Sequence, residues 1–384
     1  MQMSFSRLHL HRPALCLLAS LGIACGNLPQ PCKQGRPGAC ASSVARDAAS
    51  VGPSFEDDGG VRPGRRAMLV SVDGLGAYYL RQQLDQGKLP NFAALARAGA
   101  STLNARADYA FTVTLPNHTT MLTGRPVSAD EALPVTTYHG WTTNAEVDFS
   151  VTLHNAGNPN LSYIASVFDV AHDHGLSTCL YSGKPKFTLF TNSYNATNGA
   201  PDTVGADNGR NKIDRVAIME NRTDLLISTA VGDLVGGVCD FAFIHIADTD
   251  WVGHSDGWGS ESWLSTLDQV DGWIGRIAQL ADANETREPF ALVVTADHGG
   301  EGFGHSDETL PIDYTIPFYV VAPGLTPGGD LYALTAPRRA DPGDARPRYS
   351  EPVQPVRNAD AANAITALLG LPPVPGSFIG GLLE

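Results

Sequence analysis

Three short segments of the chain carry carboxylate and imidazole side chains that could bind a metal. The side chains concerned are Asp73 after the apolar run MLVSV, Asp250 and His254 in DWVGH, Asp297 and His298 in ADHGG, and His305 shortly after. Ionised carboxylates and neutral histidines suit zinc. A lone aspartate at a strand end is usually a turn residue, so a metal site requires the three segments to meet in the fold.

A fourth segment, TLPNHTTMLTG at 114–124, offers a hydroxyl group. Pro116 suits the first turn of a helix, and a helix N-terminus points free N–H groups toward an anion. A threonine in this place usually does no more than cap the helix. Beside a metal that lowers the pKa of its hydroxyl, the same side chain is a nucleophile, and this is how we interpret Thr114.

The elements that must position these residues alternate along the chain. Apolar runs predict buried strands at AMLVSVDG, LSTCLYSG, FAFIHIADTD, ALVVTADHGG and PFYVVAPG. Helical spacing occurs at 77–100, interrupted by Gly87 and Pro90, and at 163–174, 214–235, 260–281 and 360–369. This order predicts an α/β fold, a three-layer α/β/α sandwich around a mostly parallel sheet. Ligands of such a sheet bind at the carboxyl ends of its strands.

The composition is that of a soluble globular protein, with 384 residues, 43% hydrophobic and 17% charged. The formal net charge is −14, but residues 1–66 hold eight Lys and Arg against four Asp and Glu, which leaves −18 for residues 67–384. So acidic a surface repels polyanions, and we expect no binding of nucleic-acid polymers. A small anionic substrate would need a local positive charge, which a metal can supply.

The first residues have the features of an export signal. Arg7 and Arg12 precede the apolar run PALCLLASLGIAC, which is too short to span a bilayer. We interpret 1–24 as a signal peptide, 25–66 as a flexible linker rich in Gly, Pro, Ser and Ala, and 67–384 as the catalytic domain. The run ends in a lipobox-like sequence at Cys25, so we expect a periplasmic protein or a surface lipoprotein. Cleavage without lipidation is the alternative.

Four further cysteines follow the signal, and export permits disulfides among them. Cys32 with Cys40, and Cys179 with Cys239, are the candidate pairs. Neither pair has the spacing of a zinc finger.

The motifs together resemble the alkaline phosphatase superfamily, and within it the bacterial members of the type I phosphodiesterase and nucleotide pyrophosphatase branch. The matching pieces are VSVDG at 70–74, TLPNHTTMLTG at 114–124, DWVGH at 250–254 and ADHGG at 296–300, in the order that the family has. The resemblance extends from residue 67 nearly to the end of the chain. It implies a metal-dependent hydrolase of phosphate esters.

The resemblance also implies the ligands of two zinc ions. Asp250, His254 and His305 would hold one ion, and Asp73, Asp297, His298 and the Thr114 oxygen the other. Two such ions about 4 Å apart stabilise both oxygens of an in-line displacement. No histidine follows His305 in the sequence, which favours it as the third ligand. HGWTTN at 139–144 reproduces a family spacing that makes Asn144 a donor to a phosphate oxygen.

The substrate is less well defined by these motifs. Nucleotide pyrophosphatases have an aromatic residue after the nucleophile, where this chain has Leu115; a ring from Trp141, Trp251 or Trp258 could replace it, although each could equally be a packing residue. Lys184 and Lys186 of YSGKPKF resemble a cation pair of superfamily monoesterases. Paired lysines in a loop are usually solvated, and our candidate substrate contacts are Lys184 and Leu115.

We therefore expect an enzyme that hydrolyses phosphodiesters or pyrophosphates through a phospho-enzyme intermediate on Thr114. A monoesterase using Lys184 is the alternative within the superfamily, and an exported non-catalytic binding module is the alternative of another class. A threonine at position 114 disfavours sulfatase chemistry, which would use a modifiable Cys or Ser there. The absence of G-x-G-x-x-G after the first strand disfavours a dinucleotide enzyme.

Overall fold

The computed structural model describes residues 65–282 and 289–383. Within them eight strands form one sheet in the order β4-β3-β5-β1-β6-β7-β2-β8. The strands are β1 (Ala67–Val72), β2 (Ala100–Arg106), β3 (Thr178–Ser182), β4 (Arg215–Ile218), β5 (Phe241–Ile246), β6 (Ala291–Thr295), β7 (Thr315–Val321) and β8 (Gly329–Asp330). The five from β4 to β6 are parallel, whereas β7 is antiparallel to both β6 and β2. The predicted mostly parallel sheet is confirmed.

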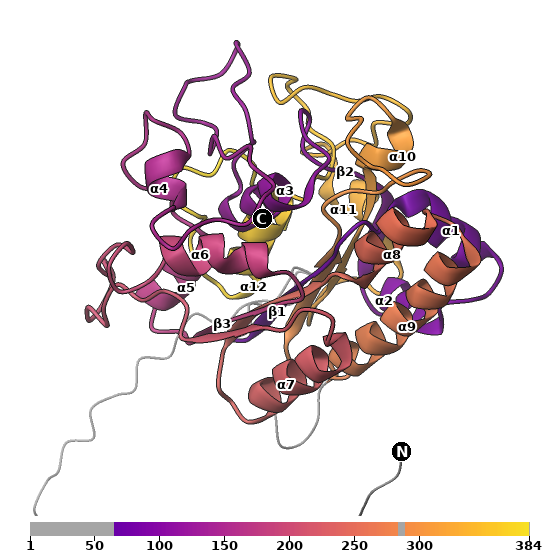
Figure 1. Ribbon diagram of the computed structural model, residues 1–384, viewed down its shortest axis with the longest axis horizontal. Helices are drawn as coiled ribbons and strands as arrows, with labels where there is room; N and C mark the ends of the chain where they lie inside the picture. The colour runs from indigo at the N-terminus through magenta and orange to yellow at the C-terminus, as the bar shows by residue number, and fades with distance from the viewer. Residues whose placement is uncertain (1–64, 283–288, 384) are drawn as a thin grey trace, which may run out of the picture. The chain divides into compact units, whose positions relative to one another are not determined.

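Helices cover both faces of this sheet (Figure 1). One face packs against α3 (Thr114–Thr123), α5 (Val167–Asp173) and α12 (Asp360–Leu368). The other packs against α1 (Ala77–Asp85), α2 (Pro90–Ala98), α7 (Thr223–Val235), α8 (Asp248–Asp256) and α9 (Glu261–Ala278). Short helical segments are α4 (Leu153–Ala156), η1 (Pro185–Phe187), α6 (Thr188–Ser193), α10 (Pro311–Tyr314) and α11 (Leu331–Thr335). The three layers agree with the predicted sandwich.

The predicted helix at 214–235 was wrong in its first part. Residues 215–218 instead form the edge strand β4, which pairs with β3. Asn221 then adopts a left-handed backbone with φ of 55°, and α7 starts two residues later. A left-handed residue ends a strand and reverses the chain without a glycine, and asparagine tolerates this conformation better than most residues. Strands β2 and β8 were not predicted.

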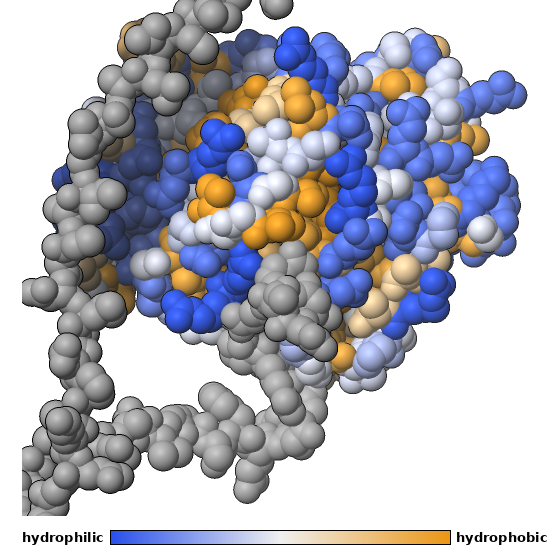
Figure 2. All heavy atoms as spheres, turned by 90° about the horizontal axis from the view of Figure 1, so that it is seen from below, coloured by the Kyte–Doolittle hydropathy of each residue, from blue (hydrophilic) through white to orange (hydrophobic). Residues whose placement is uncertain are grey.

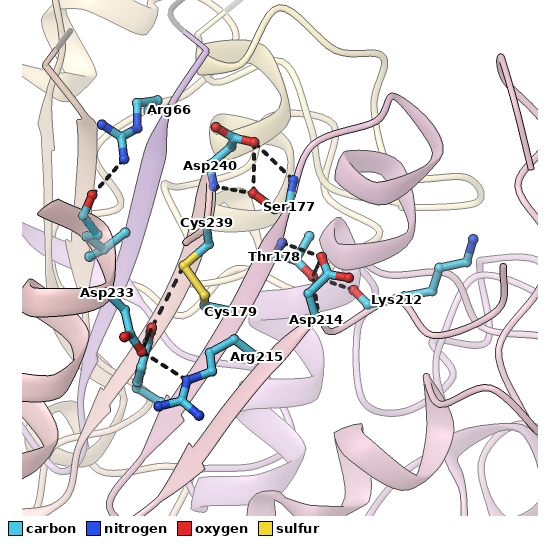
Figure 3. The surroundings of a disulfide bond; sticks show 12 residues. Arg66, Ser177, Thr178, Cys179, Lys212, Asp214, Arg215, Asp233, Cys239 and Asp240 are labelled. Atoms are coloured by element: carbon cyan, nitrogen blue, oxygen red, sulfur yellow. Dashed lines mark hydrogen bonds and ion pairs between the residues drawn. A yellow bond between two sulfur atoms is a disulfide. The ribbon is translucent and has the colours of Figure 1, made fainter. Parts of the chain in front are cut away.

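A disulfide links Cys179 in β3 with Cys239, which lies just before β5. It confirms one of the two candidate pairs. Figure 3 shows that polar contacts flank the bridge: Asp240 accepts hydrogen bonds from the backbone N–H and the hydroxyl of Ser177. The bridge therefore lies at the amino ends of β3 and β5. Cys25, Cys32, Cys40 and the expected signal and linker lie outside the described residues.

The face at the bottom of Figure 1, which includes α7, mixes polar side chains with apolar patches (Figure 2). Leu225 and Val235 of α7 are both exposed. Within residues 65–282 and 289–383, no helix has the length and hydropathy needed to cross a bilayer.

Candidate metal centre

The candidate ligands are placed by three adjacent strands of the sheet. Asp73 follows β1, Asp297 follows β6, and α8, which carries Asp250 and His254, begins two residues after β5. The chain can turn after Asp73 because Gly74 has φ of 72°. A Cβ there would also lie 3.1 Å from the Cα of Asp250, so a side chain at this position would force the two carboxylate-bearing segments apart.

Two groups of side chains at this sheet edge have their ligand atoms within 4.8 Å of one another. One group is Asp73, Asp297 and His298; the other is Asp250, His298 and His305. His298 thus lies between the two groups. His254 is at the rim, half-exposed, with its Nε2 3.4 Å from Asp250 Oδ1 and 3.1 Å from His305 Nε2. The fold brings all six predicted side chains together.

Each of the three carboxylates has one oxygen held by the protein and one left free. Asp297 Oδ1 accepts the backbone N–H groups of Gly74 and His298, each at 3.0 Å. The Oδ2 atoms of Asp73 and Asp250 each lie 2.6 Å from Lys184 Nζ. The remaining oxygens, Asp73 Oδ1, Asp250 Oδ1 and Asp297 Oδ2, are buried and form no hydrogen bond.

His298 Nε2 is also buried without a hydrogen bond. It lies 3.2 Å from Asp297 Oδ2, 3.5 Å from Asp73 Oδ1 and 3.9 Å from Asp250 Oδ1. A buried polar atom without a partner costs about 1–3 kcal/mol. Four such atoms, three carboxylate oxygens and one imidazole nitrogen, lie around the same space. Bound cations would give all four a partner, so the residues present fit divalent metal ions.

The protonation states agree with this assignment. Burial, assisted by the nearby His305, holds the pKa of His298 well below its ordinary value, so the imidazole is neutral. Burial also raises the pKa of Asp297 well above the usual range, and the charge of Asp73 adds to this effect. A bound cation would favour the ionised form of Asp297.

The pKa of Asp73 shifts in the opposite direction because a cation lies beside its carboxylate. Burial alone would raise its pKa, but the Lys184 ammonium and a hydrogen bond from His245 hold the pKa well below its usual range. His245 Nε2 lies 2.8 Å from Asp73 Oδ2. We did not predict a role for His245 from the sequence, because it occurs within the apolar run FAFIHI of β5. It orients the carboxylate as an outer-shell residue.

Thr114 is the first residue of α3, and its hydroxyl does not cap the helix. Its Oγ1 lies 3.4 Å from Lys184 Nζ. Behind it, His118 is fully buried and contacts Ser71 Oγ and the carbonyl of Thr114, each at 2.8 Å. Asn117 holds the preceding loop by donating to the carbonyl of Phe111. These contacts fix the start of the helix beside the candidate metal ligands.

Asn144 lies directly beside this helix start. Its Oδ1 accepts the backbone N–H of Leu115 at 2.8 Å and contacts Lys186 Nζ at 3.4 Å. In the described part of the chain its Nδ2 donates no hydrogen bond. Few backbone donors remain free, since Pro116 has no N–H and that of Asn117 bonds to the carbonyl of Val113. The amide of Asn144 is therefore a side-chain donor available to an anion at the start of this helix.

These groups open into a cavity of about 250 Å³. Its lining includes Thr114, Asn144, Lys184, Lys186, Asp250, His254 and His305, together with Glu146, Glu220, Pro185 and Trp251. A larger cavity of about 650 Å³ between α1, β2 and α10 holds none of the candidate ligands. Size alone would select the larger cavity, but the chemistry lies in the smaller one.

Leu115, a candidate substrate contact, lies where it cannot touch a substrate in the cavity. Its side chain is fully buried in the core and does not line the cavity. Trp141 and Trp258 are also buried, with their indole N–H groups donating to the carbonyls of Thr143 and Gly74. Trp251 alone of the three candidate tryptophans lines the cavity.

Comparisons with known proteins agree with this geometry. A model of the family "Type I phosphodiesterase / nucleotide pyrophosphatase" matches residues 67–340. No curated protein matches the chain. Solved structures of murine and human ectonucleotide pyrophosphatase/phosphodiesterase 5 are similar, one of them an inactive murine variant in complex with AMP. Each has a TM-score of 0.52 and 13% identity, covering 81% of this chain and 96% of the other. At that identity the likeness establishes the fold.

Proposed function

Because this chain belongs to the type I phosphodiesterase and nucleotide pyrophosphatase family, we propose that it hydrolyses phosphodiesters or pyrophosphates, with Thr114 as nucleophile and two zinc ions as cofactors. The observation that carries the proposal is the position of the Thr114 hydroxyl. Thr114 begins a helix and lines the cavity, and three carboxylates and an imidazole beside it leave ligand atoms without partners.

The two ligand groups would hold the ions, with His254 and the Thr114 oxygen completing them. When bound, such ions lower the pKa of a hydroxyl ligand and offset negative charge on a phosphoryl group. His245 and Lys184 both hold the outer oxygen of Asp73, Oδ2, and Lys184 also holds that of Asp250. These contacts keep the free oxygens of both carboxylates directed at the same space.

In the reaction, Thr114 Oγ1 attacks phosphorus and the bond to the leaving alcohol breaks, so the hydroxyl proton ends on that alcohol. The product on the enzyme is a phosphodiester of Thr114 that keeps the second alcohol, and water cleaves it to release a phosphate monoester and restore the hydroxyl. Asn144 Nδ2 donates to a nonbridging oxygen of the phosphoryl group. Because its Oδ1 accepts the Leu115 N–H at the start of α3, the amide is fixed in place before substrate arrives.

The first experiment measures metal content and turnover in one preparation. We expect about two zinc ions per chain and hydrolysis of bis-p-nitrophenyl phosphate. Thr114→Ala should lower kcat by at least about a thousandfold while zinc stays bound. Thr142→Ala, which changes an exposed threonine outside the cavity, is the matched control. A folded, metal-free and inert protein would instead support the non-catalytic module.

A phosphate monoesterase remains the second candidate, and the contact between Lys184 Nζ and Thr114 Oγ1 favours it. The charge of Lys184 is already balanced by Asp73 and Asp250, however, which leaves less of it for a dianionic substrate. The test compares kcat/KM for p-nitrophenyl phosphate and bis-p-nitrophenyl phosphate. A large monoester preference that Lys184→Ala removes, with zinc retained, would establish the monoesterase.

We also propose that the protein is exported and anchored by a lipid on Cys25. The sequence pattern at 1–25 supports this, and the mass of the processed N-terminal peptide tests it. An acylated cysteine is expected at the mature N-terminus. A peptide that starts near the same place without a lipid would indicate a periplasmic protein.

A further inference from the structure

His305 is a buried residue in a stretch of chain that is otherwise exposed. The residues on either side of it, 301–304 and 306–307, are exposed, whereas His305 itself is 4% exposed. Four of the six residues that connect His298 to His305 are glycines, which allow the backbone a wide choice of conformations. Backbone hydrogen bonds close this loop without involving His305. The loop by itself therefore does not determine where the imidazole lies.

Thr112 holds His305 by both its ring and its backbone. The ring Nδ1–H of His305 donates to the carbonyl of Thr112, and the hydroxyl of Thr112 donates to the carbonyl of His305, each at 2.5 Å. Thr112 is buried and lies in the segment that leads into the nucleophile Thr114. Two residues far apart in the sequence are thus joined by a reciprocal pair of hydrogen bonds.

Asn117 fixes the segment that contains Thr112. Its Nδ2 donates to the carbonyl of Phe111 at 2.8 Å and to that of Val113 at 3.1 Å, the residues on either side of Thr112. Its Oδ1 accepts the side-chain N–H of Asn358 at 2.7 Å. With both flanking carbonyls held by the amide, the carbonyl of Thr112 is the one directed at the imidazole.

The bond to Thr112 also determines which ring nitrogen of His305 is free. A carbonyl only accepts, so the proton of the neutral ring is on Nδ1 and Nε2 keeps its lone pair. His254 is arranged in the same way, with its Nδ1 3.0 Å from the carbonyl of Phe303. The two Nε2 atoms lie 3.1 Å apart, and that of His305 lies 3.5 Å from the partnerless Oδ1 of Asp250. Three groups that only accept thus converge, which suits a cation.

We propose that Thr112 is a positioning residue, whose reciprocal hydrogen bonds hold His305 in the direction and tautomer that a metal ligand requires. The inference rests on the proposed function, which assigns His305 to a bound ion. It accounts for a ligand at the end of a glycine-rich loop, because a separate and braced segment supplies the rigidity that the loop lacks. The same segment carries Thr114, so ligand and nucleophile share one support.

The first measurement is made on the zinc-free full chain labelled with ¹⁵N-histidine. Long-range ¹H–¹⁵N correlation spectra report which nitrogen of each ring carries the proton, and the signals missing from His305→Gln are those of His305. We expect the proton on Nδ1 in the wild type. A His305 ring that carries its proton on Nε2 overturns the inference.

Variants connect this tautomer to zinc binding. Thr112→Val removes the hydroxyl and should weaken one of the two zinc ions about tenfold in chelator competition, with the other bound as in wild type. In its zinc-free form, His305 should divide between both tautomers. Thr112→Ser keeps the hydroxyl and should restore the wild-type result in both measurements.

Thr335→Val is the matched control. It removes another buried threonine hydroxyl, which donates to the carbonyl of Leu331 at 2.6 Å in α11, outside the cavity. If loss of a buried hydroxyl acted only through general stability, this variant would weaken zinc as Thr112→Val does. We expect it to leave both the zinc affinity and the His305 tautomer unchanged.

The outcomes separate the two proposals. A Thr112→Val chain that binds both ions as tightly as wild type overturns this inference and leaves the proposed function standing. A folded wild type that binds no zinc overturns the metal assignment of the proposed function, and this inference with it. If Thr112→Val does not fold, the tautomer of His305 in the wild type decides.

Discussion

His139 should make the protein sensitive to acid, and the effect can be calculated. The ring is fully buried. Its Nδ1 accepts the backbone N–H of Trp141 at 3.0 Å, so the proton of the neutral ring is on Nε2, 3.0 Å from Thr120 Oγ1. A second proton would face the Trp141 N–H. Burial, with the charge of Arg125 adding to it, accordingly lowers the pKa of His139 to about 3.

The size of the effect follows from proton linkage. An unfolded chain protonates histidine near pH 6.5, whereas the folded chain does not until about pH 3. Because the folded pKa is depressed, the stabilisation is present above pH 6.5 and is lost as the pH falls. Between pH 7.5 and pH 5.0 the loss is about 2 kcal/mol of the free energy of unfolding. His139→Asn keeps an acceptor for Trp141 but does not titrate there.

Urea unfolding at both pH values measures this difference. Wild type should lose about 2 kcal/mol more than His139→Asn between pH 7.5 and pH 5.0. Thr120→Val, which keeps the ring and removes only the hydroxyl contact, should retain the wild-type pH dependence. If wild type and His139→Asn lose stability in parallel, the ring is not held neutral and the reasoning is refuted.

Three further predictions concern other sites. Replacing Cys179 and Cys239 by serine should lower the free energy of unfolding by about 4 kcal/mol in urea titrations, from the loop entropy of their 60-residue separation. Burial raises the pKa of Asp313 to about 6 and its Oδ1 has no partner. The unfolded chain ionises this carboxyl from about pH 4 and the folded chain only near pH 6, so stability is lost as the pH rises through this range, and Asp313→Asn should stabilise the protein by about 2 kcal/mol more at pH 8 than at pH 4.5. His245→Ala, which leaves Lys184 as the one remaining contact of Asp73 Oδ2 among the described residues, should weaken zinc binding about 10- to 100-fold in chelator competition.

The layered fold was predictable because its central strands are continuous apolar runs. Every residue of β1 and β5 is buried, and a strand covered on both faces leaves that pattern in the sequence. The edge strand β4 was not recognisable, since it has four residues and its first, Arg215, is exposed. Its pairing with β3 decides its structure, and pairing is a long-range property that local periodicity does not contain.

The clustering of the candidate metal ligands was predictable for a similar reason, because parallel strands bring their carboxyl ends to one edge. The sequence could not indicate which oxygen of each carboxylate is held by the protein and which is left for a metal. Lys184 looked like a solvated loop residue, yet it is buried and contacts Asp73 and Asp250. Leu115 failed as a substrate contact because the first turn of α3 directs it into the core, and a motif position does not specify the direction of a side chain.

The disulfide has a consequence for the alignment of the active site. β3 leads into Lys184 and β5 into the helix of Asp250, and the bridge joins these two strands at their opposite ends. A slip of one residue between paired strands turns every side chain to the other face of the sheet. The covalent bond therefore fixes the register between β3 and β5 at their amino ends. This register places Lys184, after β3, beside Asp250, after β5.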